Sequence, residues 1–268
     1  MRPPAYRRPG LVALGLLAGL SSPGVGASSL RPLPDLAASP LRSTCSPAEA
    51  VAKSEPAAAV LTPAGVEAPG TYAAKLATTP LGWARLERWC VWVEPVTEAG
   101  PGGRWDRRWG TAVATALGRW QAVLPIEQVD DPAAAQVRIL RRRPPLRQGP
   151  GGRMRASHGR ALLRLRTVQR RGSWRDEPQV DVLISPDQRA LALEATALHE
   201  LGHAFGLWGH SDDPADAMAM VPGATPRTEL SGRDRATVLW LYRQPTRFGL
   251  PRPEPQQEIR MEREALRR

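Results

Sequence analysis

Residues 199–220 read H-E-L-G-H-A-F-G-L-W-G-H-S-D-D-P-A-D-A-M-A-M and hold three of the chain's four histidines, His199, His203 and His210. Positions four apart lie on one face of a helix, so a helix here aims His199 and His203 at one point. Gly206 can adopt a left-handed backbone that ends the helix and brings His210 back as a third nitrogen. Three protein ligands and one open position are what a catalytic zinc ion requires. The stretch therefore predicts a zinc-binding helix.

Glu200 follows the first histidine and is not one of these ligands. A carboxylate beside a zinc site can take a proton from water and later pass it to a leaving amine. Glu200 is therefore the candidate catalytic base. The alternative is a solvated helix face with incidental histidines, which the third histidine and the intervening glycine disfavour.

The pattern H-E-x-x-H-x-x-G, with a later histidine and methionine, resembles the metzincin zinc peptidases and most closely their matrixin branch. Met218 lies eight residues after His210, at the position of that family's Met-turn. Residues 230–242, L-S-G-R-D-R-A-T-V-L-W-L-Y, look like the matrixin C-terminal helix. The resemblance implies an α+β fold, a metzincin-like catalytic domain in which a mixed twisted sheet accompanies the zinc-binding active-site helix and a C-terminal helix. It also implies a zinc-dependent endopeptidase.

One departure from the common matrixin pattern concerns the third ligand. Leu207, Trp208 and Gly209 separate Gly206 from His210, where two residues are usual. This longer spacing resembles bacterial matrixin-like peptidases, and it leaves Asp212 and Asp213 as competitors for the third position. Matrixins also carry structural calcium and a second zinc, but no segment here matches those ligands.

The chain ends differ in composition from its middle. Residues 1–27 combine early arginines, an apolar run over residues 11–20 and small residues before position 28, as in an export signal. Ten apolar residues are too few for a transmembrane helix, which needs about 20. Residues 28–80 are rich in Ala and Pro and read as a prosegment or linker. The peptidase domain is then expected over residues 81–246 and a charged tail over residues 247–268, in a secreted or periplasmic protein.

The only two cysteines are Cys45 and Cys90. In an exported chain this favours a disulfide bond between them. The alternative is that Cys45 acts as an inhibitory thiolate on the zinc, as in matrixin prosegments, although S-T-C-S-P does not match that family's motif.

Periodicity predicts the remaining elements. The i, i+3, i+4 spacing of Trp and aliphatic residues predicts a helix over residues 105–123 whose aromatic stripe belongs to the core. Strands are expected over residues 88–94, 135–140, 161–166 and 180–185. Capping boxes are expected at Ser185 with Gln188, opening the zinc helix, and at Ser231 with Asp234, opening the last helix.

The positive charge is concentrated. The stretch from Arg138 to Arg175 holds 13 arginines and no acidic residue, within a chain of net charge +11. Such a local field can recruit an anionic partner. Trp174 is the stretch's single aromatic residue, so a nucleic-acid stacking surface is not expected. A second interpretation is therefore an exported polyanion-binding protein on an inactive peptidase-like scaffold. The presence of Glu200 favours an enzyme acting on protein or peptide substrates, because a binding scaffold needs no base.

Overall fold

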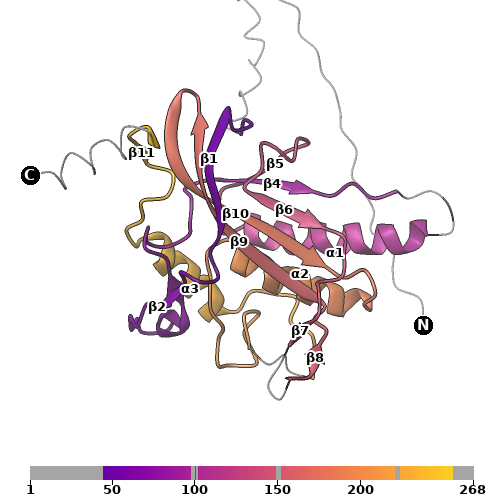
Figure 1. Ribbon diagram of the computed structural model, residues 1–268. Coiled ribbons are helices and arrows are strands. Elements are labelled where there is room, and N and C mark those ends of the chain that lie inside the picture. The colour runs from indigo at the N-terminus through magenta and orange to yellow at the C-terminus, as the bar shows by residue number, and fades with distance from the viewer. Residues whose placement is uncertain (1–44, 98–99, 101, 149–151, 221–223, 256–268) are drawn as a thin grey trace, which may run out of the picture. The chain divides into compact units, whose positions relative to one another are not determined.

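The computed structural model describes residues 45–97, 100, 102–148, 152–220 and 224–255 (Figure 1). The predicted export signal, residues 28–44 and the end of the predicted tail from residue 256 lie outside these ranges. Among the described residues, no helix is both long and apolar enough to cross a membrane.

The described elements follow one another along the chain in an order that alternates strands with three α-helices. They are β1 (Ala50–Pro56), β2 (Thr62–Pro63), the 3-10 helix η1 (Ala73–Lys75), β3 (Ala77–Thr78), β4 (Trp89–Val93), α1 (Gly103–Gln121), β5 (Ile126–Gln128), β6 (Val137–Leu140), β7 (Arg147–Gln148), β8 (Met154–Arg155), β9 (Gly159–Arg170), β10 (Ser173–Ile184), α2 (Ala190–Ala204), α3 (Gly232–Tyr242) and β11 (Pro251–Arg252).

The main sheet is mixed, as expected for the α+β class. Its strand order is β1-β9-β10-β6-β4-β5, and β11 pairs with β10. Strands β5, β4, β6 and β10 are parallel, whereas β9 is antiparallel to β10 and β1 is antiparallel to β9. Each strand predicted from the sequence is present, and β9 and β10 are longer than predicted, with 12 residues each.

The two long helices pack on each other and close the core. The buried face of α1 includes Trp109, Val113, Leu117 and Trp120, which confirms that the aromatic stripe is core. The Trp120 indole donates to the Leu198 carbonyl on α2 at 3.0 Å, so α1 fixes the helix that carries the first two histidines.

The domain begins well before residue 81. Strand β1 forms the outer strand beside β9, and Tyr72 and Leu76 are buried in the core. The disulfide bond between Cys45 and Cys90 joins this segment to β4, as predicted. The described part of residues 28–80 is therefore not a linker in this structure, and Cys45 has no free thiolate for an inhibitory role.

Two further expectations need correction. The segment after residue 246 starts in the fold, because Phe248 is buried and β11 pairs with β10. The zinc helix begins at Ala190 with Arg189 as its N-cap and no side-chain cap, so the predicted Ser185 capping box is wrong. Gln188 instead accepts a hydrogen bond from the Thr196 hydroxyl and donates to the Ser185 carbonyl, which holds the loop against the helix.

Candidate metal centre

The structure brings His199, His203 and His210 together. One potential ligand atom from each lies within 4.8 Å of the others, and among the described residues this is the one such cluster of three or more His, Cys, Asp or Glu side chains. His199 and His203 project from consecutive turns of α2, which ends at Ala204. Gly206 then adopts a φ of 110°, the predicted left-handed turn that lets the chain return to His210.

Backbone carbonyls orient two of the rings. His199 Nδ1 lies 2.8 Å from the Ala217 carbonyl, and His203 Nδ1 lies 2.7 Å from the Leu207 carbonyl. Each Nδ1–H can therefore donate to its carbonyl, which leaves the Nε2 lone pair for a metal. Burial lowers the pKa of His199 to about 4, and burial also lowers the pKa values of His203 and His210. Neutral imidazoles are the form that binds zinc, so the donor set fits that ion.

Glu200 lies beside the cluster and is buried. Burial raises the pKa of its carboxyl to about 7, while a hydrogen bond from the Ala161 backbone and the charge of Arg160 act in the opposite direction. A carboxylate with a pKa near neutrality can both accept and return a proton.

The extra residue before His210 is accommodated by contact with the N-terminal segment. Ala77 N–H donates to the Trp208 carbonyl at 2.7 Å, and Leu76 forms a β-bridge with Gly209. A Cβ atom on Gly209 would lie 2.1 Å from the Lys75 carbonyl oxygen, so only glycine permits this approach. The Trp208 ring stacks on His203 with centroids 5.7 Å apart. The loop is thus fixed on both sides.

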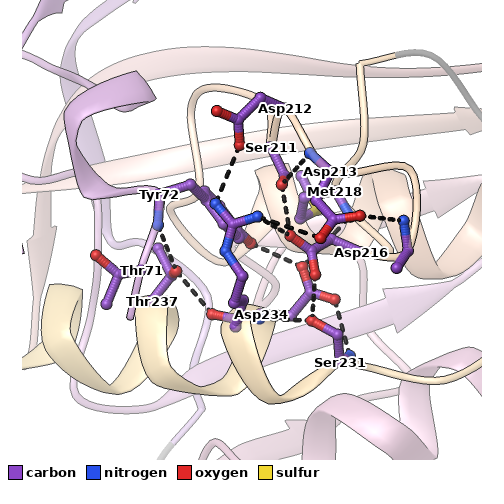
Figure 2. Close-up of polar contacts among 12 residues, drawn as sticks. Thr71, Tyr72, Ser211, Asp212, Asp213, Asp216, Met218, Ser231, Asp234 and Thr237 are labelled. Carbon is purple, nitrogen blue, oxygen red and sulfur yellow. Dashed lines mark hydrogen bonds and ion pairs between the residues drawn. The ribbon is translucent and has the colours of Figure 1, made fainter. Parts of the chain in front are cut away.

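Asp212 and Asp213, the competing third ligands, are engaged elsewhere. Both form ion pairs with Arg233, at 3.0 Å and 3.7 Å. The hydrogen bond from Arg233 lowers the pKa of the exposed Asp212. Figure 2 shows both carboxylates within the network of polar contacts beside Asp216 and Asp234. The structure therefore places His210, and neither aspartate, beside the other two histidines.

A buried polar network supports the turn under the histidines (Figure 2). Asp234, on the first turn of α3, accepts hydrogen bonds from the Tyr72 hydroxyl at 2.9 Å and from the Ala217 N–H at 2.8 Å. It also forms the predicted capping box with Ser231. The Ala217 carbonyl in turn accepts a hydrogen bond from His199. Tyr72 is therefore linked to a histidine of the cluster through the Asp234 carboxylate and the Ala217 backbone. Met218 is fully buried next to Gly202 of α2, as expected for a Met-turn.

Two cavities flank the cluster. One of about 450 Å³ is lined by His199 and Glu200, by Gln188 and by the chain around Ala217 and Arg227. The other, of about 340 Å³, is lined by all three histidines and Glu200 and by Leu61, Arg147, Arg160, Ala161 and Trp208, among others. Both cavities thus reach His199 and Glu200, and only the smaller one also reaches His203 and His210.

Sequence reasoning missed several of these contributors. Tyr72, Leu76 and Leu61 come from a segment whose composition resembles a linker, and no periodic pattern marks them. In the sequence, Arg160 is distinguished only as one of the arginines of a charged stretch. Asp234 was recognised as a cap, but its contact with the Met-turn has no local signature.

A family model described as Matrixin matches residues 106–243, which is more than half of the chain. The chain therefore belongs to the matrixin family. No curated protein matches it. Membership identifies a zinc metallopeptidase-like domain whose substrates are proteins or peptides, and it implies zinc as the metal.

Proposed function

We propose that the protein is an exported zinc-dependent endopeptidase in which His199, His203 and His210 bind the metal and Glu200 is the general base. The observation that carries this proposal is the convergence of three neutral imidazoles beside a buried carboxylate in an open cleft. Zinc, when bound, lowers the pKa of a coordinated water to roughly 7 and polarises the scissile carbonyl.

The chain's own groups supply the remaining chemistry. Glu200 accepts the proton of the attacking water and delivers it to the leaving amine, which its raised pKa of about 7 suits. The Ala217 and Leu207 carbonyls keep the imidazoles of His199 and His203 in the required orientation and tautomer. The Asp234 carboxylate keeps Ala217 in place by accepting its N–H, and the buried Met218 lies next to Gly202 of α2.

Export is part of the proposal. Residues 1–27 have the pattern of a signal, and the Cys45–Cys90 disulfide supports an oxidising destination, because such bonds persist mainly outside the cytosol. Appearance of the protein in the periplasm or medium, with an N-terminus near residue 28, would test this directly. Cytoplasmic accumulation of the uncleaved chain would contradict it.

The central experiment measures metal and activity on the same purified sample. We expect about one zinc per chain after gel filtration, casein cleavage that a chelator abolishes, and recovery when zinc is restored. A chain that takes up no zinc, or that binds zinc and cleaves neither casein nor any peptide from a mixed pool, would overturn the proposal.

The second candidate, a polyanion-binding protein, rests on the arginine-rich stretch. On β9 the partly exposed Arg166 lies near Arg170, Arg138 and Arg164. Its pKa is lowered, mainly by partial burial and secondly by these neighbouring positive charges. However, at least five arginines between Arg138 and Arg175 are paired with acids from other segments: Arg138, Arg141, Arg142, Arg143 and Arg170. The remaining field is weaker than the sequence implies, so an anionic partner here is the lesser proposal. Retention on heparin that persists in an Arg164→Gln, Arg166→Gln variant would dismiss this face.

A further inference from the structure

Two arginines of the charged stretch line the candidate catalytic cleft. Arg147 lies on β7 and Arg160 near the start of β9, and both border the cavity of about 340 Å³ that contains the three histidines and Glu200. Arg160 is close enough to Glu200 and to Arg147 for their charges to shift its pKa, which is lowered first by burial and then by Arg147. The cleft therefore has a cationic wall beside the cluster.

Neither of these arginines has a close ion-pair partner in the described part of the chain, although the charge of the nearby Glu200 acts on Arg160. Five neighbours in the same stretch do have such partners, for example Arg138 with Asp181 at 2.7 Å across β6 and β10. Among the described residues, the only carboxylate that lines this cavity is that of Glu200, and it is buried. The wall thus keeps positive charge available for a bound molecule.

The same part of β9 is where an extended chain has room. The pairing of β1 with β9 ends at Pro56 opposite Arg164, and Ala57 makes a last hydrogen bond to the Leu163 carbonyl. The chain then leaves the strand, and Leu61 lines the cavity. Residues 159–162 of β9 pair with β10 on one side and have no strand beside them on the other among the described residues. A ligand lying there passes Arg160.

We propose that this wall selects substrates with an acidic side chain, Glu or Asp, next to the scissile bond on the Leu61 side of the histidines. The inference rests on the peptidase function proposed above and adds a substrate class to it. Arg160 and Arg147 bind the carboxylate by charge-assisted hydrogen bonds, which are stronger than neutral ones. Both are specificity residues and take no part in the proton transfers.

The test uses the full, disulfide-bonded, zinc-loaded protein and pairs of fluorogenic peptides that differ only by Glu or Gln at one position. At one position of the peptide, or at two adjacent positions, we expect kcat/KM for the Glu peptide to exceed that for the Gln peptide by about tenfold or more. The reason is that hydrogen bonds to charged groups contribute more than neutral ones. The preference should shrink as salt is raised.

Variants assign the preference to the wall. Arg160→Gln and Arg147→Gln should each move the Glu/Gln ratio towards one, Arg160→Lys should retain most of it, and Arg160→Glu should favour a Lys-containing peptide. Arg164→Gln is the matched control, since it removes the same charge from the same strand outside this cavity. The ratio is measured within each enzyme, so a general loss of activity does not obscure it.

Two negative results have different meanings. Equal cleavage of Glu and Gln peptides at every position would overturn the acidic preference and leave the peptidase function intact. Absence of cleavage of every peptide by the zinc-loaded protein would overturn the function itself. An acidic preference that survives in the Arg147→Gln, Arg160→Gln double variant would also refute the assignment.

Discussion

Glu200 is the residue whose chemical role separates an enzyme from a binding scaffold. Its side chain is buried beside the three histidines but does not belong to their ligand cluster. We therefore expect Glu200→Gln to keep the metal and lose catalysis. General-base catalysis contributes about 10²- to 10⁴-fold, so the loss in kcat should be of that size. Casein or peptide cleavage and zinc content are the measurements.

Glu194→Gln is the control for this substitution. Glu194 lies on the same helix, forms an ion pair with Arg119 at 3.0 Å and lines neither of the two cavities beside the histidines. Its kcat should stay close to that of the parent. Undiminished cleavage by Glu200→Gln would mean that another group accepts the proton.

The third ligand is also decided at the residue scale. His210→Ala should lower zinc affinity sharply, because it removes one of three imidazole donors from the cluster. Asp212→Ala and Asp213→Ala should change zinc affinity little, since both carboxylates point to Arg233. Zinc titrations against a competing chelator measure all three, and the reverse order would assign the ligand to an aspartate.

At the scale of elements, the loop before His210 depends on a close backbone approach. Gly209→Ala places a methyl group 2.1 Å from the Lys75 carbonyl, so the loop must move away from residues 75–77. We expect weaker zinc binding together with a loss of stability of about 1–3 kcal/mol, the usual cost of overpacking.

Gly118→Ala is a suitable comparison. Gly118 lies on helix α1, and a Cβ atom added there would have no neighbouring atom within 4 Å. That change should leave zinc affinity unaltered and raise stability slightly. If Gly209→Ala binds zinc as tightly as the parent, the contact with residues 75–77 is not needed for the site.

The network between η1 and α3 gives a second element-scale prediction. Tyr72→Phe removes the hydroxyl that donates to Asp234 at 2.9 Å and leaves a buried carboxylate short of one donor. Such a loss costs about 1–3 kcal/mol. Thermal denaturation should show it, and zinc should dissociate faster because Asp234 also holds the Ala217 N–H. An unchanged zinc off-rate would show that the Met-turn does not need Tyr72.

What the sequence predicts depends on whether the signal is local. The stripe on α1 and the Ser231 cap are each encoded within a few residues, and the structure confirms both. The spacing of His199 and His203 is equally local, and the structure places the two rings close together on α2. The histidine cluster also required one non-local step, the return at Gly206, which a glycine makes visible in the sequence.

Strand β1, by contrast, has no local signal in the sequence that would predict it. Its sequence A-V-A-K-S-E-P is mostly exposed, so it lacks the alternation of buried residues that marks a strand. Its position is set by backbone pairing with β9 more than a hundred residues later. Tyr72 and Asp234, 162 residues apart, likewise cannot be paired from composition or period.

For the molecule as a whole, the disulfide joins the N-terminal segment to the sheet. It closes a loop with a sequence separation of 45 residues, for which chain entropy gives about 4 kcal/mol of stabilisation. Replacing both cysteines by serine should therefore lower the free energy of unfolding by about 2–4 kcal/mol in urea titrations.

Reduction of the parent protein should give a similar decrease, while the double variant should no longer respond to the reductant. Equal stability of the oxidised parent and the variant would show that β1 and Tyr72 alone hold the segment in place.

The contact between Tyr72 and Asp234 bears on the order in which the metal centre can be completed during synthesis. Tyr72 leaves the ribosome long before its partner on α3, and until residue 234 has been made the Met-turn lacks the carboxylate that fixes Ala217 and, through it, His199. A nascent chain that already carries both helix histidines therefore lacks a finished site. The histidine cluster therefore depends on residues from both ends of the domain and is completed only when the last helix has been made.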